Sequence, residues 1–129
     1  MNQRYLLLPL ILSGFGFAGC SEQKTEVQTV SFSKDVLPVF SAYCVECHRP
    51  GGAGLEASGL SLESYDNIMK GTKFGSIVTP GSSVSSTLVV LIEGKADKSL
   101  KMPHGEREPL APETVKTIKD WIDQGAKKN

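Results

Sequence analysis

The stretch Cys44-Val45-Glu46-Cys47-His48 decides how this 129-residue sequence is interpreted. Two cysteines separated by two residues on a helical turn present both thiols on one side. The histidine that follows directs its imidazole to the same face. Two such thiols reach the two vinyl groups of one porphyrin edge, while the imidazole reaches the iron. This C-x-x-C-H spacing is typical of covalent c-type haem attachment, so we predict thioether bonds at Cys44 and Cys47 and proximal iron ligation by His48.

Other uses of a cysteine pair fit the sequence less well. A thioredoxin-like C-x-x-C needs a βαβ setting, whereas the flanks of this motif have helical patterns. A structural zinc site needs four ligands, and outside the motif the chain has only His104 and Cys20, of which Cys20 is expected to carry lipid. A disulfide between Cys44 and Cys47 would leave His48 without a role. One covalently bound haem c is therefore the predicted cofactor.

The sixth iron ligand is expected from the segment Lys101-Met102-Pro103-His104-Gly105. Pro103 removes a backbone donor and stiffens the chain beside Met102, so this loop is suited to present the thioether to the iron. Met69 lies within a helical pattern and is expected to pack in the core. His104 is the alternative distal ligand. A thioether favours Fe(II), so a His48/Met102 pair would raise the reduction potential relative to two histidines.

The hydrophobic periodicity predicts an all-α fold with four helices and no strand. The first helix is expected to start at Ser33 as N-cap and to lead into Cys44. Residues 51–59, with the sequence GGAGLEASG, are expected to form a flexible loop beside the haem motif. The other three helices are predicted over 62–70, over 84–93, with a strand over 87–92 as the alternative, and from Pro112 to Gly125. Trp121 on the last of these is expected to pack against the first helix or the haem edge.

The chain resembles class I cytochromes c, and more closely the short haem domains called planctomycete-type cytochrome c. The resemblance implies a small class I cytochrome c fold, with about four helices around one haem, crossed first and last helices and one exposed haem edge. The histidine of C-x-x-C-H and the methionine of an M-P motif are the axial ligands in such domains, which implies His48 and Met102 here. The family often has M-P-P where this chain has M-P-H, so His104 stays the alternative. The matching landmarks are Phe32-Ser33-Lys34-Asp35-Val36-Leu37-Pro38, Cys44 to His48, Gly59-Leu60-Ser61-Leu62-Glu63-Ser64-Tyr65, Ile77-Val78-Thr79-Pro80-Gly81, Lys101-Met102-Pro103 and Trp121-Ile122-Asp123-Gln124-Gly125-Ala126.

The N-terminal segment has the order of a secretory signal, with one arginine, an apolar run over 6–12 and small residues after it. An uncleaved anchor helix is the alternative, but the apolar run falls short of the roughly 20 residues that span a membrane. Phe17-Ala18-Gly19-Cys20 resembles the bacterial lipobox, in which cleavage precedes the cysteine and the new N-terminal cysteine carries lipid chains. Ser21 in place of the aspartate that resembles an inner-membrane retention signal favours the outer membrane.

Three segments are thus expected: a lipoprotein signal peptide over 1–19, a lipidated N-terminus and flexible tether over 20–31, and a cytochrome c domain over 32–129.

The 14 basic and 14 acidic residues give no net charge, which argues against nucleic-acid binding. No carboxylate pair or Ser/His/Asp set is evident, so neither an enzyme nor a small-molecule substrate is expected.

We therefore expect an exported, lipid-anchored electron carrier that faces the periplasm, is held to the membrane by its lipid and exchanges electrons with other redox proteins. The first alternative is a haem-based sensor or peroxidase-like protein in which the distal ligand is displaced. The second is an electron-accepting accessory subunit of a membrane enzyme.

Overall fold

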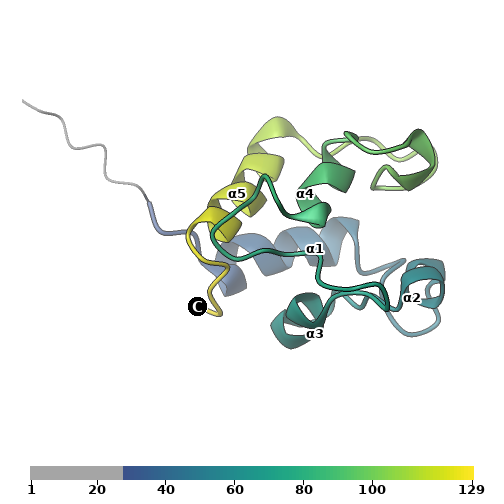
Figure 1. The fold of residues 1–129 in the computed structure, drawn as a ribbon, viewed down its shortest axis with the longest axis horizontal. Helices are drawn as coiled ribbons and strands as arrows, with labels where there is room; N and C mark the ends of the chain where they lie inside the picture. Colours follow the sequence, from purple (N-terminus) through teal and green to yellow (C-terminus); the bar gives the residue numbers. More distant parts are fainter. Residues whose placement is uncertain (1–27) are drawn as a thin grey trace, which may run out of the picture.

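The computed structural model describes residues 28–129, and over this range the chain is helical without a β-strand (Figure 1). The all-α prediction is confirmed. The predicted signal peptide, Cys20 and most of the tether lie outside the described residues. None of the helices within the described range is both long and apolar enough to cross a membrane. The elements are η1 (Phe32–Val36), α1 (Leu37–Tyr43), α2 (Ala53–Ser58), α3 (Tyr65–Lys70), α4 (Thr87–Ile92), η2 (Lys98–Leu100) and α5 (Pro112–Asp123).

The first helix begins earlier than predicted, because Ser31 and not Ser33 is its N-cap. The Ser31 hydroxyl accepts a hydrogen bond from the Lys34 amide (3.3 Å), and the Asp35 carboxylate accepts one from the Ser31 amide (2.7 Å). This reciprocal arrangement satisfies amides that the first turn of a helix leaves free. The first turns are π-helical as η1, which ends two residues before Pro38, a residue without an amide proton to donate. The helix then continues as α1 and leads into Cys44, as predicted.

Residues 53–58 form α2, and the prediction of a flexible loop over 51–59 is wrong. The glycines suggested a loop, but they lie where the helix starts, packs and ends. Gly52 is the N-cap, and Gly59 ends the helix in the left-handed conformation at φ 75°. A Cβ atom at Gly52 would lie 2.4 Å from the Cys47 carbonyl oxygen, and one at Gly54 would lie 2.8 Å from His48 Cε1. Glycine therefore lets α2 pack directly on the C-x-x-C-H turn.

The next two helices are shorter than predicted. Helix α3 begins at Tyr65 and not at residue 62, because Ser64 is its N-cap and accepts a hydrogen bond from the Asn67 amide (3.3 Å). It ends at Gly71, whose φ of 78° favours glycine. Residues 87–92 form helix α4, so the helix prediction is confirmed over the strand alternative. Helix α5 starts at Pro112, as predicted.

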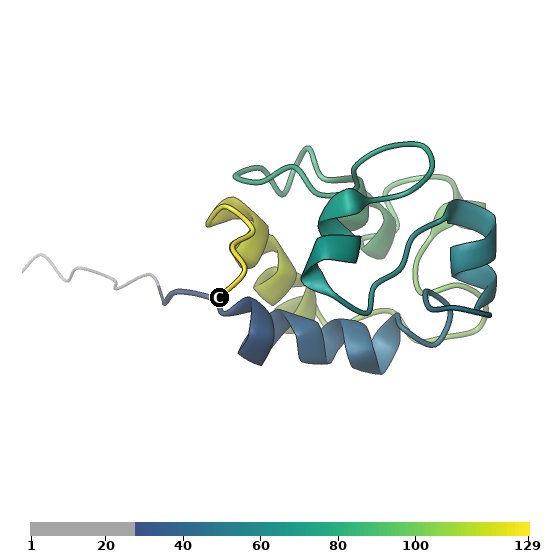
Figure 2. The same cartoon turned by 90° about the horizontal axis from the view of Figure 1, so that it is seen from below.

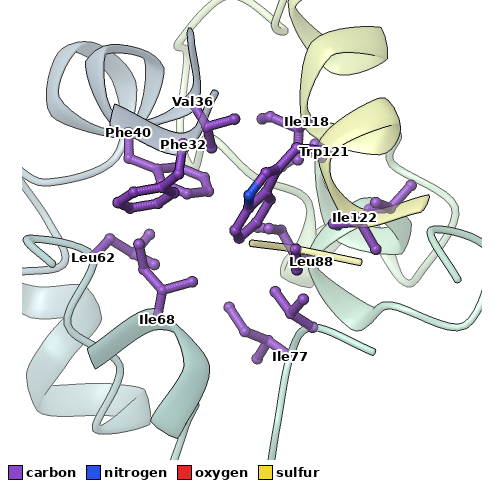
Figure 3. Packing of buried hydrophobic residues seen from close by; sticks show 14 of the residues in the cluster. Phe32, Val36, Phe40, Leu62, Ile68, Ile77, Leu88, Ile118, Trp121 and Ile122 are labelled. Carbon is purple, nitrogen blue, oxygen red and sulfur yellow. The ribbon is translucent and has the colours of Figure 1, made fainter. Parts of the chain in front are cut away.

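The core is formed where the first and last helices meet (Figures 1 and 2). Trp121 is 1% exposed and projects from α5 toward the phenylalanines of η1 and α1 (Figure 3). Its ring centroid lies 5.5 Å from that of Phe32, and its Nε1 donates a hydrogen bond to the Lys127 carbonyl (2.9 Å). Trp121 therefore packs against the first helix, which is the first of the two positions expected for it. The other fully buried large side chains are Val36, Phe40, Ile68, Ile118 and Ile122.

The two ends of the described chain are tied together by a group of hydrogen bonds that we call the terminal clamp. Asn129 accepts from the Ser33 amide through its backbone oxygen (2.9 Å) and from the Phe32 amide through Oδ1 (2.7 Å). The Val30 amide donates to Gln124 Oε1 (2.8 Å). The terminal clamp lies at the η1 end of the first helix, whereas Cys44 lies at the other end of that helix (Figure 1).

Removing the central indole should strongly destabilise the fold. For Trp121→Ala we expect a loss of about 3–5 kcal/mol in the free energy of unfolding, because a large buried side chain leaves a cavity. Urea denaturation followed by circular dichroism measures this loss. Phe74→Ala is the control, since Phe74 is 82% exposed, and it should change the value by less than about 0.5 kcal/mol. Equal effects of the two substitutions would contradict the assigned core.

A methyl group at residue 54 should also destabilise the protein. Alanine in place of glycine ordinarily stabilises a helix by up to about 1 kcal/mol. For Gly54→Ala we expect the opposite sign, a loss of about 1–3 kcal/mol, because the new Cβ overlaps the His48 ring. The same urea titration measures it, with Glu56→Ala at an exposed position of α2 as the control. A Gly54→Ala protein more stable than the wild type would show that α2 does not pack on His48.

Candidate haem-binding site

The C-x-x-C-H motif forms one tight turn at the end of α1. Cys44 is the C-cap residue, and its amide donates to the Phe40 carbonyl (2.9 Å). The Cys44 carbonyl then accepts from two amides, those of Cys47 (3.2 Å) and His48 (3.0 Å). This turn brings the two cysteines and the histidine together, as predicted. Both cysteines are free thiols and half-buried. Burial, with a smaller contribution from the neighbouring Cys47, raises the pKa of Cys44 to about 11.

The imidazole of His48 is buried and oriented by a backbone carbonyl. The side chain is 7% exposed, and its Nδ1 lies 3.2 Å from the Leu60 oxygen. Because a carbonyl oxygen only accepts hydrogen bonds, the proton is on Nδ1 and the lone pair of Nε2 is free to bind a metal. Burial lowers the pKa of His48, and this outweighs the Leu60 carbonyl, which acts to raise it. The neutral imidazole, which is the form that ligates iron, is therefore favoured.

Helix α2 packs beside Nε2 of His48 through a residue that has no side chain. A Cβ atom at Gly54 would lie 2.9 Å from Nε2 and would fill the space beside it. The chain thus offers two adjacent thiols and one neutral imidazole. Because residue 54 is glycine, no side chain from that position lies beside the imidazole Nε2. These are the groups that covalent attachment and axial ligation of a haem require. The residues present therefore fit a c-type haem.

The segment that carries Met102 joins η2 to α5. The Met102 amide donates to the Leu91 carbonyl (3.1 Å), and its half-buried side chain packs against the core. His104 is exposed. Met69 of α3 is also half-buried against the core, which agrees with the packing role expected for it. Met102 is thus half-buried against the core, and His104 is open to solvent.

A salt bridge joins the Met102 segment to the C-x-x-C-H turn. Arg107 Nη2 donates to Glu46 Oε2 over 2.6 Å. Hydrogen bonding to Arg107 lowers the pKa of Glu46, and the same bond raises the pKa of Arg107. Both groups are therefore charged at neutral pH. Burial is the main cause of the lowered pKa of His48, and the charge of His104 makes a smaller contribution in the same direction.

Three features of this site were not found from the sequence. Leu60 acts through its backbone carbonyl, so its side chain carries no signal. Gly54 stood within a glycine-rich stretch, but its role depends on how α2 packs. The pairing of Glu46 with Arg107 joins residues 61 positions apart, and one sequence gives no sign of it.

Comparison with known proteins supplies independent support. Residues 44–106, just under half of the chain, match the family model described as planctomycete cytochrome C. The match begins at Cys44 and includes His48, Met102 and His104. No curated protein and no solved structure shows significant similarity to the chain. The family match and the helical fold together support a c-type cytochrome-like domain in this chain.

Proposed function

We propose that this protein is a monohaem c-type cytochrome that carries single electrons between redox partners, with His48 and Met102 as axial ligands. The observation that carries the proposal is the turn that groups two free thiols with a buried imidazole whose Nε2 is available. Cytochrome c domains generally carry electrons and are not enzymes, and the family implies a covalently bound haem c. When bound, that group accepts and releases one electron at its iron.

On the proximal side, the chain holds one nitrogen in a fixed direction. The bond from His48 Nδ1 to the Leu60 oxygen sets the orientation of the ring and increases the basicity of Nε2. The amide of Leu62 donates to the His48 carbonyl (2.9 Å), which attaches the following segment to the same residue. Little rearrangement is then needed when the charge at the site changes by one electron, as electron transfer requires.

On the distal side, Met102 would supply a soft sulfur ligand from a half-buried position. Cys44 is likewise half-buried against the apolar core. An apolar environment disfavours the more highly charged oxidised state, and a thioether ligand acts in the same direction. Both effects support a higher reduction potential than two histidine ligands in a polar site would give.

Export and lipid attachment complete the proposal. Their support is the N-terminal sequence, in which a secretory signal precedes a lipobox-like stretch that ends at Cys20. Two or more acyl chains on this cysteine would hold the protein firmly to the outer membrane, facing the periplasm. Its partners would be other redox proteins, which carriers of this kind meet through small and weak interfaces.

A haem-based sensor or peroxidase-like protein is the alternative function. It is favoured by the exposure of all residues from His104 to Pro109, next to the proposed distal ligand. In that case the Met102 segment would move aside and let a small molecule reach the iron. Rapid binding of carbon monoxide by the reduced native protein would support this alternative, and slow or absent binding supports the electron carrier.

Substitution of the distal ligand should change the reduction potential. For Met102→Ala we expect a fall on the order of 0.1 V, a fraction of the roughly 0.8 V that axial ligands span, together with new binding of carbon monoxide. Spectroelectrochemistry of the reduced and oxidised holoprotein measures both effects. The matched substitution is His104→Ala, which should leave the potential and the spectrum unchanged. The reverse pattern would assign the sixth position to His104.

Removal of both thiols should abolish covalent haem. Wild-type protein matured with working haem-ligation machinery should give a c-type pyridine haemochrome spectrum and an intact mass that includes one haem and the lipid on the N-terminal cysteine. Cys44→Ala with Cys47→Ala should lose the haem increment and keep the lipid, since the two attachments use different cysteines. Colourless wild-type protein without a haem increment would overturn the proposed function.

A further inference from the structure

The exposed stretch beside the site has few attachments to the rest of the protein. We call residues 101–109 the ligand loop. The bond from the Met102 amide to Leu91 holds its start (3.1 Å), and the buried Leu110 follows its end. For residues 103–109, the hydrogen bonds described over residues 28–129 comprise a single attachment, from Arg107 to Glu46 (2.6 Å).

This attachment joins the two sides of the proposed haem site. Glu46 lies between the two cysteines of the C-x-x-C-H turn, which supplies the proximal side. Arg107 lies on the loop that carries Met102, which supplies the distal side. The Glu46 side chain is 68% exposed and that of Arg107 is 41% exposed, so the pair lies at the surface and is accessible to salt.

We propose that the Arg107–Glu46 pair is an ionic latch that holds the ligand loop against the C-x-x-C-H turn and thereby limits the access of small ligands to the sixth iron position. The inference rests on the proposed function, because it requires Met102 at that position. Arg107 and Glu46 are positioning residues, since they act on the iron through the loop. Opening the latch releases residues 103–109, while the Leu91 bond and the buried Leu110 still hold the loop ends.

The latch should respond to ionic strength. Charges at a surface are screened over about 10 Å at 0.1 M salt and about 3 Å at 1 M. An exposed ion pair changes an opening equilibrium by only about two- to five-fold. The hydrogen bond between Met102 and Leu91 joins uncharged backbone groups and is far less sensitive to salt. Dependence on salt therefore separates the latch from the other attachments of the loop.

Imidazole binding to the ferric holoprotein tests the latch. Glu46→Gln and Arg107→Gln should each raise the apparent imidazole affinity about two- to five-fold at low salt, as read from the Soret band. The difference from wild type should vanish near 1 M salt. The double charge reversal Glu46→Arg with Arg107→Glu should restore the wild-type affinity. In the Arg107→Gln variant, Arg49 remains in place and its charge still acts on Glu46.

Asp66→Asn provides a matched control. Lys128 and Asp66 form another exposed pair between distant segments, at 2.9 Å, and the substitution removes one negative charge as Glu46→Gln does. It should leave imidazole affinity at the wild-type value. Unchanged affinity in Glu46→Gln at low salt, or an equal shift in Asp66→Asn, would overturn the latch.

A second measurement separates the latch from the proposed function. Amide hydrogen exchange over residues 103–109 should be faster in Glu46→Gln than in Asp66→Asn, whatever the sixth ligand is. If Met102→Ala changes neither spectrum nor potential, the proposed ligation fails, and the exchange rates then decide only whether the Arg107–Glu46 pair holds the ligand loop. Equal exchange rates in the two variants would then contradict it.

Discussion

The Cys44 carbonyl accepts two amide hydrogen bonds, and the rest of the site depends on the turn that they close. This turn places two thiols and one imidazole next to each other at the end of α1. Its position is fixed in turn by the packing of the first helix against Trp121 of α5. A small core and a local turn are thus coupled, because any movement of the helix would carry the cysteines with it.

The two sides of the site are built differently. On the proximal side, His48 is buried, bonded to Leu60 and packed under α2 through Gly54. On the distal side, Met102 is half-buried on a loop whose outer residues are exposed. The proposed proximal ligand is therefore held by many contacts and the proposed distal ligand by few. Under the proposed ligation, this difference would make the distal side the place where coordination is adjustable.

The sequence predicted those features that follow from local spacing. The C-x-x-C-H turn and the start of α5 at Pro112 depend on residues a few positions apart, and the burial of Trp121 follows from the apolar stripe of its own helix. Helix α2 was missed because its glycines have a role only when the helix lies on Cys47 and His48. The Leu60 carbonyl and the Arg107–Glu46 pair likewise depend on contacts between distant segments, which one sequence does not reveal.

The terminal clamp makes the two ends of the first helix structurally different. Asn129 and Gln124 hold residues 30–33 at the η1 end of the first helix, and the cysteines occupy its opposite end. An attachment through the polypeptide upstream of Gln28 would therefore act on the end of the domain that is remote from the thiols. The domain would rotate about that end, and the end that carries the thiols would face away from the attachment point.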